Sequence, residues 1–244
     1  MAIRVLINGA DGKMGQAAVQ AISADKQFIL AAKTGRQNHL ADAIQKNKID
    51  VALDLTEASV AKKNLLTILE AGARPVIGTS GLTQLDVDDI RKQYATQKIG
   101  GIIVPNFSLG AVLMMKCAEL IAPYFSDVEI IEMHHAGKLD SPSGTAVRTA
   151  EILNAGRHHK PSTPPNAREL LPGARGATHQ AIPIHSIRLP GLIAHQRIIF
   201  GGTGEILSIQ HDTTDRQCFM PGVLLACKKV MDLDHILYGL ENIL

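Results

Sequence analysis

Short apolar runs alternate with amphipathic segments through the first half of the chain. The runs are too short for helices, so we expect them to be strands. They cover residues 3–7, 28–32, 51–56, 76–77 and 99–104. Between them, apolar residues recur at spacings of three and four, which predicts helices over 14–22, 59–70 and 84–95. Strands that alternate with helices predict an α/β fold with a Rossmann-type, doubly wound parallel sheet.

The pattern changes after Pro105-Asn106, where the alternation of strands and helices ends. We place a domain boundary there, because proline restricts the residue before it. Beyond it we expect a second α+β domain with an open mixed sheet of about four strands. The expected strands cover 129–135, 182–189, 194–200 and 205–211, and the expected helices cover 109–121 and 145–153.

The connections in this second domain predict how its sheet is built. The turns at Pro190-Gly191 and at 201–204 are short enough to join antiparallel neighbours. Both helices would cover one face of the sheet, and apolar side chains on the other face would be buried economically by a second subunit. The segment 155–181 has no periodicity and is expected to be a loop.

A glycine-rich turn follows the first strand and reads Gly9-Ala10-Asp11-Gly12-Lys13-Met14-Gly15. A dinucleotide fingerprint requires this order of strand, glycine turn and helix, since the glycines let backbone N–H groups approach a pyrophosphate. The spacing is G-x-x-G-x-x-G rather than the commoner G-x-G-x-x-G. Tight packing of a strand-to-helix turn is therefore the alternative interpretation.

The end of the second strand bears on the choice of cofactor. It reads Lys33-Thr34-Gly35-Arg36, without the acid that usually binds the ribose hydroxyls of NAD. Arg36, with Lys13, would attract a 2′-phosphate, so we expect NADPH to be preferred over NADH. The alternative is that both cations are solvated loop residues.

Ligands of a doubly wound sheet bind at the carboxyl ends of its strands. The loops that follow the third, fourth and fifth expected strands should therefore line one cleft with the glycine turn. These loops contain Thr56, then Gly78-Thr79-Ser80, and then Val104-Pro105-Asn106-Phe107.

Candidate catalytic and binding residues are concentrated between residues 129 and 146, where an expected strand ends at His134-His135 and is followed by Lys138. Neighbouring strand residues point to opposite faces unless the strand ends between them. A helix then starts, with Ser141 or Ser143 as its N-cap and Pro142 suited to a first turn. The backbone N–H groups of Ser143-Gly144-Thr145 at this helix start are expected to bind a carboxylate.

One continuous pattern in this region resembles a family signature. The residues are His134-His135-x-x-Lys138-x-Asp140-x-Pro142-Ser143-Gly144-Thr145-Ala146. They resemble the signature of the 4-hydroxy-tetrahydrodipicolinate reductases, also called dihydrodipicolinate reductases, of lysine and diaminopimelate biosynthesis. The resemblance implies NAD(P)H-dependent reduction of a small dicarboxylate ring substrate by a homotetramer built through the second sheet.

The resemblance also implies roles for the residues that match. His134 would be the acid/base group and Lys138 a proton donor or charge stabiliser, while His135 with Ser143-Gly144-Thr145 would hold a substrate carboxylate. Asp140 is expected to position Lys138 or its loop. The family's D-F-T and G-T-T cofactor loops appear here as Asp54-Leu55-Thr56 and Gly78-Thr79-Ser80.

Domain organisation follows from the pattern and the resemblance together. We expect residues 1–105 with 215–244 to form a dinucleotide-binding domain, to which a last helix over 223–231 returns. Residues 106–214 would form the substrate-binding and oligomerisation domain, and the two domains would close on the substrates. The connection between the second and third strands is shorter than in many relatives, so its helix should be stunted.

Composition and charge restrict the possible partners and the location of the protein. A net charge of +2 without a basic run argues against nucleic acid binding. Three cysteines without a C-x-x-C pair, and no apolar stretch of about 18 residues or leader peptide, predict a cytoplasmic protein without a membrane span. His134-His135 and His158-His159 fit no zinc spacing, so no metal is expected.

Two rival functions stay open: another two-domain nicotinamide-dependent amino-acid dehydrogenase, such as a homoserine dehydrogenase, and a non-catalytic dinucleotide sensor.

Overall fold

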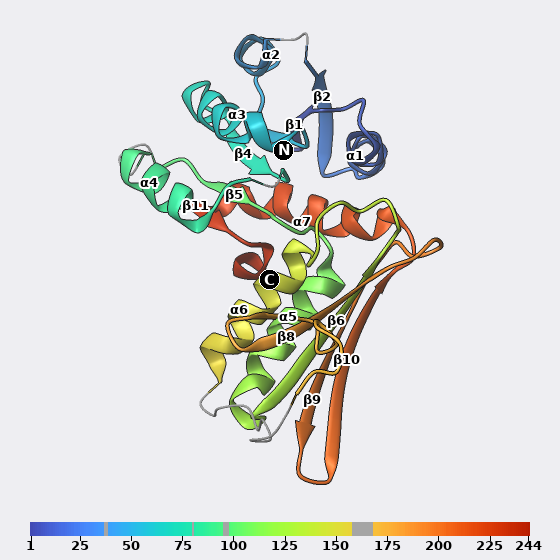
Figure 1. Ribbon diagram of the computed structural model, residues 1–244. Helices are drawn as coiled ribbons and strands as arrows, with labels where there is room; N and C mark the ends of the chain where they lie inside the picture. The colour runs from blue at the N-terminus through green and yellow to red at the C-terminus, as the bar shows by residue number, and fades with distance from the viewer. Residues whose placement is uncertain (37–38, 80, 95–97, 158–167) are drawn as a thin grey trace. The chain divides into compact units, whose positions relative to one another are not determined.

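The computed structural model describes residues 1–36, 39–79, 81–94, 98–157 and 168–244 (Figure 1). The chain divides into two compact units, and each is described by itself. The first is Met1–Leu109 with Arg216–Leu244, and the second is Gly110–Asp215.

The first unit contains a sheet of six parallel strands in the order β11-β5-β4-β3-β1-β2. Its strands are β1 Ile3–Asn8, β2 Phe28–Thr34, β3 Val51–Asp54, β4 Arg74–Ile77, β5 Gly101–Ile103 and β11 Ile236–Tyr238. The predicted parallel sheet is confirmed, and the strand order reverses between β1 and β3, where doubly wound folds bind ligands. β11 was not predicted, because its three residues are too few for a recognisable apolar run.

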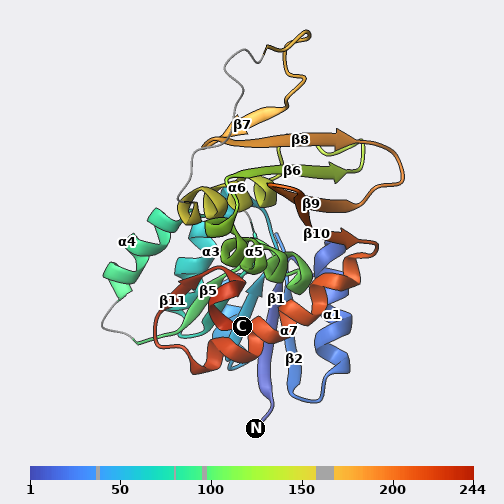
Figure 2. The same cartoon turned by 90° about the horizontal axis from the view of Figure 1, so that it is seen from below.

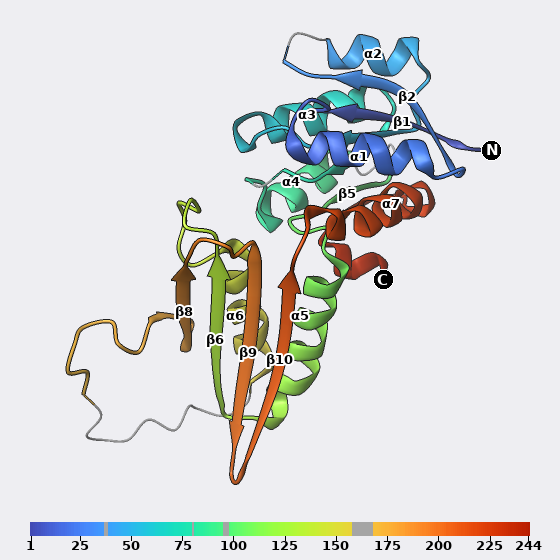
Figure 3. The ribbon, with the colours of Figure 1, turned by 90° about the vertical axis from the view of Figure 1, so that its right-hand side faces the viewer.

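Helices cover both faces of this sheet. One apolar cluster joins α2 (Leu40–Lys46), α3 (Ala58–Glu70) and α4 (Gln84–Tyr94) to the strand residues of one face. On the other side, α1 (Lys13–Ala24) contacts β1, β2 and α7 (Met220–Lys229) (Figures 2 and 3). With seven residues, α2 is the short crossover helix expected.

The second unit contains a five-stranded sheet in the order β10-β9-β6-β8-β7. Its strands are β6 Asp127–His134, β7 Ala177–His179, β8 Ile182–Arg188, β9 Ala194–Gly202 and β10 Glu205–Thr213. Because β6 and β8 run parallel while the other pairs are antiparallel, the sheet is mixed, as predicted, and it has one more strand than expected. The extra strand, β7, lies in the segment expected to be a loop.

One predicted pairing in this sheet is wrong. β8 and β9 are not neighbours, because β6 lies between them and pairs with both (Figure 3). The connection through Pro190-Gly191 must therefore cross one intervening strand, a step of roughly 10 Å. Five residues, 189–193, span this easily, so a short connection did not require direct pairing.

Helices α5 (Leu109–Ile121) and α6 (Gly144–Gly156) cover one face of this sheet, as predicted. Their apolar side chains share a buried cluster with alternate residues of β6, β8 and β9. The other face carries only partly buried or exposed apolar side chains: Ile131, Met133, Ile187, Ile199 and Ile206. Short 3-10 helices complete the chain: Ala122–Tyr124, Arg216–Phe219, Val230–Asp232 and Leu240–Ile243.

Within the described residues, every helix is too short or too polar to cross a membrane.

Close packing at the glycine turn predicts an asymmetric response to alanine. A Cβ on Gly15 would lie 2.1 Å from the carbonyl oxygen of Gly9, whereas a Cβ on Gly12 would lie 3.4 Å from it. Gly15→Ala should therefore lower the free energy of unfolding by about 2–3 kcal/mol. Gly12→Ala, the matched control, should cost less than about 1 kcal/mol. Denaturant unfolding compares the two, and equal stability would contradict this packing.

Candidate active site

The end of β6 places the two adjacent histidines. His134 is the last residue of the strand, opposite Arg188 of β8 and Ala194 of β9, and its side chain is 16% exposed. His135 follows the strand end and is exposed. The strand thus ends between the two histidines, so strict alternation of faces does not apply to them.

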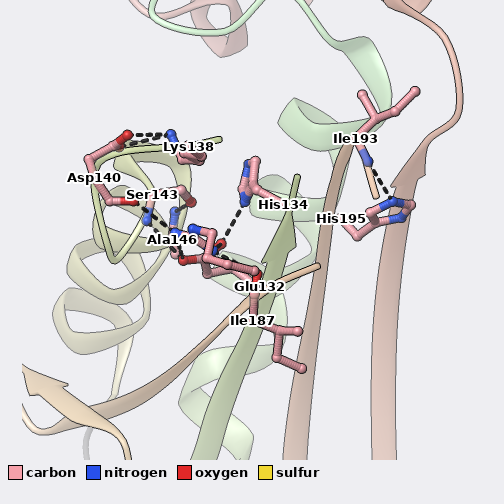
Figure 4. A network of polar contacts seen from close by, with 10 residues as sticks. Glu132, His134, Lys138, Asp140, Ser143, Ala146, Ile187, Ile193 and His195 are labelled. Carbon is pink, nitrogen blue, oxygen red and sulfur yellow. Dashed lines mark hydrogen bonds and ion pairs between the residues drawn. The ribbon is translucent and has the colours of Figure 1, made fainter. Parts of the chain in front are cut away.

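Glu132 lies beneath His134 and contacts several polar groups (Figure 4). Its side chain has no exposed surface. One oxygen, Oε2, lies 2.6 Å from Nδ1 of His134 and accepts from Nη1 of Arg188 at 2.9 Å. The other, Oε1, accepts from Nη2 of Arg188 at 2.7 Å and from the backbone N–H of Ser143 at 3.2 Å. The hydroxyl of Ser186 is a further partner.

Lys138 belongs to the loop that joins β6 to α6. Its Nζ donates to both carboxylate oxygens of Asp140, at 2.7 and 2.8 Å. The backbone carbonyl of Asp140 accepts from Nη2 of Arg188 at 2.8 Å. Arg188 therefore connects the loop that carries Lys138 to the carboxylate that supports His134.

Ser143 is the N-cap of α6, and its Oγ accepts from the backbone N–H of Ala146 at 3.2 Å. Of the two serines proposed as caps, the structure uses this one, and Pro142 precedes the cap instead of lying in the first turn. The N–H of Ser143 donates to Glu132, so it is not directed at an external anion. Gly144 is exposed, and no atom lies within 4 Å of the position its Cβ would take. An anion can therefore approach the helix start at Gly144 more closely than at Ser143.

The electrostatics of this cluster follow from burial and pairing. Burial works to raise the pKa of Glu132, but hydrogen bonds from Arg188, Ser186 and His134 outweigh it and lower that pKa. Burial is also the main reason why the pKa of His134 is below its usual range, despite the hydrogen bond to Glu132. The site thus holds an ionised Glu132 beside a neutral histidine at pH 7, which can accept or release a proton when its environment changes.

The glycine turn of the first unit has the form of a pyrophosphate site. Gly9 has a φ of 84°, and a Cβ there would lie 2.8 Å from the carbonyl oxygen of Leu55, so a side chain is excluded. Gly12 is the N-cap of α1 and caps it with no side chain, and the first turn contains no acidic residue. A helix start with these features suits the phosphates of a dinucleotide.

A buried polar cluster connects the strand ends next to this turn. Asn8 donates to the Asp54 carboxylate at 3.1 Å and accepts from Thr34 at 3.0 Å. Thr56 Oγ1 also donates to Asp54, at 2.8 Å. Burial is the largest cause that raises the pKa of Asp54, although hydrogen bonds from Thr56, Asn64 and Asn8 oppose it. The contacts of Asn8 and Thr34 were not predicted, because side-chain contacts between strands are not visible in a local sequence pattern.

The other predicted cofactor residues have different environments. The side chain of Arg36 is 93% exposed, and its Nη2 lies 3.8 Å from Oε2 of Glu57. Val104 is fully buried, so it offers only its backbone, while Thr79 is buried and Phe107 packs over Gly78. Ala10 is buried, Asp11 and Lys13 are exposed, and Met14 is partly buried; Pro105 is exposed and Asn106 partly buried. Ser80 lies outside the described residues.

His158 and His159 also lie outside the described residues. Among the residues that are described, no group of three or more His, Cys, Asp and Glu side chains is arranged to hold a metal ion.

Comparison with known proteins identifies the family of this chain. A family model for the N-terminus of dihydrodipicolinate reductase matches residues 3–107, and a model for its C-terminus matches residues 110–244. The chain belongs to the dihydrodipicolinate reductase family. Family members named 4-hydroxy-tetrahydrodipicolinate reductase from Legionella pneumophila (strain Lens) and Coxiella burnetii (strain Dugway 5J108-111) are 52% and 51% identical to it, over the full length of each chain.

Solved structures agree with this family assignment. A dipicolinate-bound dihydrodipicolinate reductase from Paenisporosarcina sp. TG-14 matches with a TM-score of 0.90 and 44% identity, covering 100% of both chains. A scyllo-inositol dehydrogenase from Lactobacillus casei matches with a TM-score of 0.62 at only 10% identity, over 95% of this chain and 88% of that one. The second match shows a shared fold alone, and the family assignment rests on the family models and the relatives that are 51–52% identical.

The buried position of His134 predicts its titration. Its pKa in the folded protein should be below 6.5, because burial disfavours the imidazolium. As the pH falls below 6.5, the unfolded chain binds this proton first, so the stability contributed by neutral His134 is present above pH 6.5 and lost below it. NMR titration of the ring protons, assigned with His134→Gln, measures this pKa. A midpoint above 6.5 would mean that pairing with Glu132 outweighs burial.

Proposed function

We propose that this protein reduces the dihydrodipicolinate ring formed from 4-hydroxy-tetrahydrodipicolinate, yielding tetrahydrodipicolinate for lysine and diaminopimelate biosynthesis. The observation that carries the proposal is full-length membership of the family together with the cluster around His134. One unit supplies a glycine turn suited to a dinucleotide, and the other supplies a histidine, a lysine and a helix start suited to a dianionic ring. We propose that the first unit is the dinucleotide-binding domain and the second the substrate-binding domain.

The reaction adds one hydride and one proton to the ring. When bound, the reduced nicotinamide dinucleotide supplies the hydride to C4. Electron density then develops along the conjugated imine, and a cation with a proton source must stabilise it. We assign the cation and the proton donor to Lys138, and we assign to His134 the acid/base role of taking up a proton at Nε2 and passing it on. Gly144 and Thr145 at the start of α6, with His135, would hold a ring carboxylate, and Ser143 would shape this site as the helix cap.

The rival dehydrogenase shares the fold of the first unit but does not require a histidine, a lysine and a helix-start anion site in the second. The sensor would bind the dinucleotide without turnover. Turnover of the ring substrate, generated in place from pyruvate and aspartate semialdehyde by its synthase, separates all three. Turnover that requires the synthase supports the reductase, whereas tight dinucleotide binding without turnover supports the sensor.

The proposed catalytic roles predict a specific kinetic pattern. His134→Ala and Lys138→Ala should each lower kcat by about 10²–10⁴-fold, because the developing charge loses its stabilisation. The Kd for NADPH should stay within about twofold of the wild-type value, since neither residue belongs to the unit with the glycine turn. Lys116→Ala, which removes a half-exposed lysine from α5, is the matched control. Near-normal kcat in either active-site variant would remove that residue from the mechanism.

For the cofactor we propose NADPH as the preferred reductant and NADH as a poorer one. The support is an exposed Arg36 guanidinium after β2, in a segment, Lys33-Thr34-Gly35-Arg36, that contains no acid, although Glu57 lies 3.8 Å from the guanidinium. Arg36→Ala should raise the KM for NADPH roughly tenfold, because a charge-assisted hydrogen bond is lost. The KM for NADH serves as the internal control and should change less than about twofold. An equal change in both would rule out recognition of a 2′-phosphate.

We also propose that the protein is a cytoplasmic homotetramer, assembled through the uncovered face of the five-stranded sheet. The support is the row of apolar side chains on that face, such as Ile131 and Ile199, which water would otherwise contact. Light scattering should report four times 26.2 kDa. Ile199→Lys should reduce this mass, while Leu120→Lys, at an exposed position on α5, should not. A monomeric wild-type protein would refute the assembly.

A further inference from the structure

We propose that Glu132 is a positioning residue that holds His134 as its Nδ1–H tautomer, so that only Nε2 exchanges a proton with the ring substrate. The catalytic half of this inference rests on the proposed function. The tautomer itself is a property of the second unit alone.

The hydrogen-bond partners of Glu132 determine what it can do. The guanidinium of Arg188 and the backbone N–H of Ser143 can only donate, and between them they occupy both carboxylate oxygens. An ionised carboxylate has no hydrogen to give. The 2.6 Å contact with His134 therefore requires the hydrogen to be on Nδ1 of the imidazole.

The charges around His134 favour the same arrangement. Three charged groups act on it: Glu132 on its own strand, Arg188 on β8 and Lys138 in the loop after the strand. Arg188 is paired with the buried Glu132 carboxylate, which keeps Glu132 ionised. An ionised carboxylate remains a hydrogen-bond acceptor. The Glu132 side chain has no exposed surface and lies below the His134 ring, so it fixes the orientation of that ring (Figure 4).

Replacing Glu132 by glutamine tests this, because an amide must place its NH₂ group against an acceptor. Of the groups bonded to Glu132, only Nδ1 of His134 and the hydroxyl of Ser186 are able to accept. Removing the hydroxyl with Ser186→Ala leaves His134 as the only one. In the double variant, Glu132→Gln with Ser186→Ala, Nη1 of Arg188 should turn away from the amide NH₂ that replaces Oε2, and this NH₂ should donate to Nδ1, which moves the ring hydrogen to Nε2.

The measurement is long-range proton–nitrogen NMR of protein labelled with ¹⁵N-histidine, at a pH where His134 is neutral and with the signal assigned by His134→Gln. Wild type and Ser186→Ala should show the Nδ1–H tautomer, and the double variant should show Nε2–H. Glu129→Gln is the matched control: Glu129 lies on the other face of β6, 2.7 Å from His185, and its loss should leave the His134 signal unchanged.

Steady-state kinetics then tests the consequence for the reaction. The double variant should lower kcat about 10²–10⁴-fold relative to Ser186→Ala, with KM changed by less than about threefold. A wild-type Nε2–H tautomer would overturn the proposal, and this result does not require the double variant to fold. The same tautomer in wild type and a folded double variant would overturn it as well. If the wild-type tautomer is Nδ1–H but the ring substrate is not reduced, the proposed function is wrong and the tautomer assignment stands.

Discussion

A carboxylate without exposed surface is costly unless its charge is compensated, and the second unit is organised around that requirement. Glu132 obtains its compensation from Arg188 through two hydrogen bonds. Its oxygens also bond to His134, to the N–H of Ser143 and to the hydroxyl of Ser186. One buried charge thus connects a strand end, a neighbouring strand and the start of a helix.

This connection explains why the reactive groups keep a defined geometry although they lie in a loop region. Arg188 also binds the backbone carbonyl of Asp140, whose carboxylate holds Lys138. The lysine and the histidine are therefore supported by the same guanidinium. Removing Arg188 would leave the buried charge of Glu132 uncompensated, which costs far more than the pair contributes.

The strand ends of the first unit also contain a buried carboxylate that is compensated by hydrogen bonds. Asp54 is also fully buried, but amide and hydroxyl groups surround it instead of a cation. Burial accordingly raises the pKa of Asp54, whereas the guanidinium helps to lower that of Glu132. Both clusters lie next to a segment of backbone N–H groups suited to anions.

Local patterns in the sequence predicted the structural features that depend on residues close together in the chain. The parallel sheet, the glycine turn and the helix start after Lys138 all follow from spacing within about ten residues. The pair of Glu132 and Arg188 was missed, because 56 residues separate its members and no local rule links them. The insertion of β6 between β8 and β9 was missed for the same reason, since a short connection is compatible with either pairing.

The most direct test of this arrangement around Glu132 is a crystal structure of the protein with dipicolinate bound. One ligand carboxylate should accept hydrogen bonds from the N–H groups of Gly144 and Thr145, with Nε2 of His134 facing the ring. Glu132 should retain its contacts with Arg188 and Nδ1 of His134. Dipicolinate bound away from the start of α6, or a Glu132 side chain turned away from His134, would contradict it.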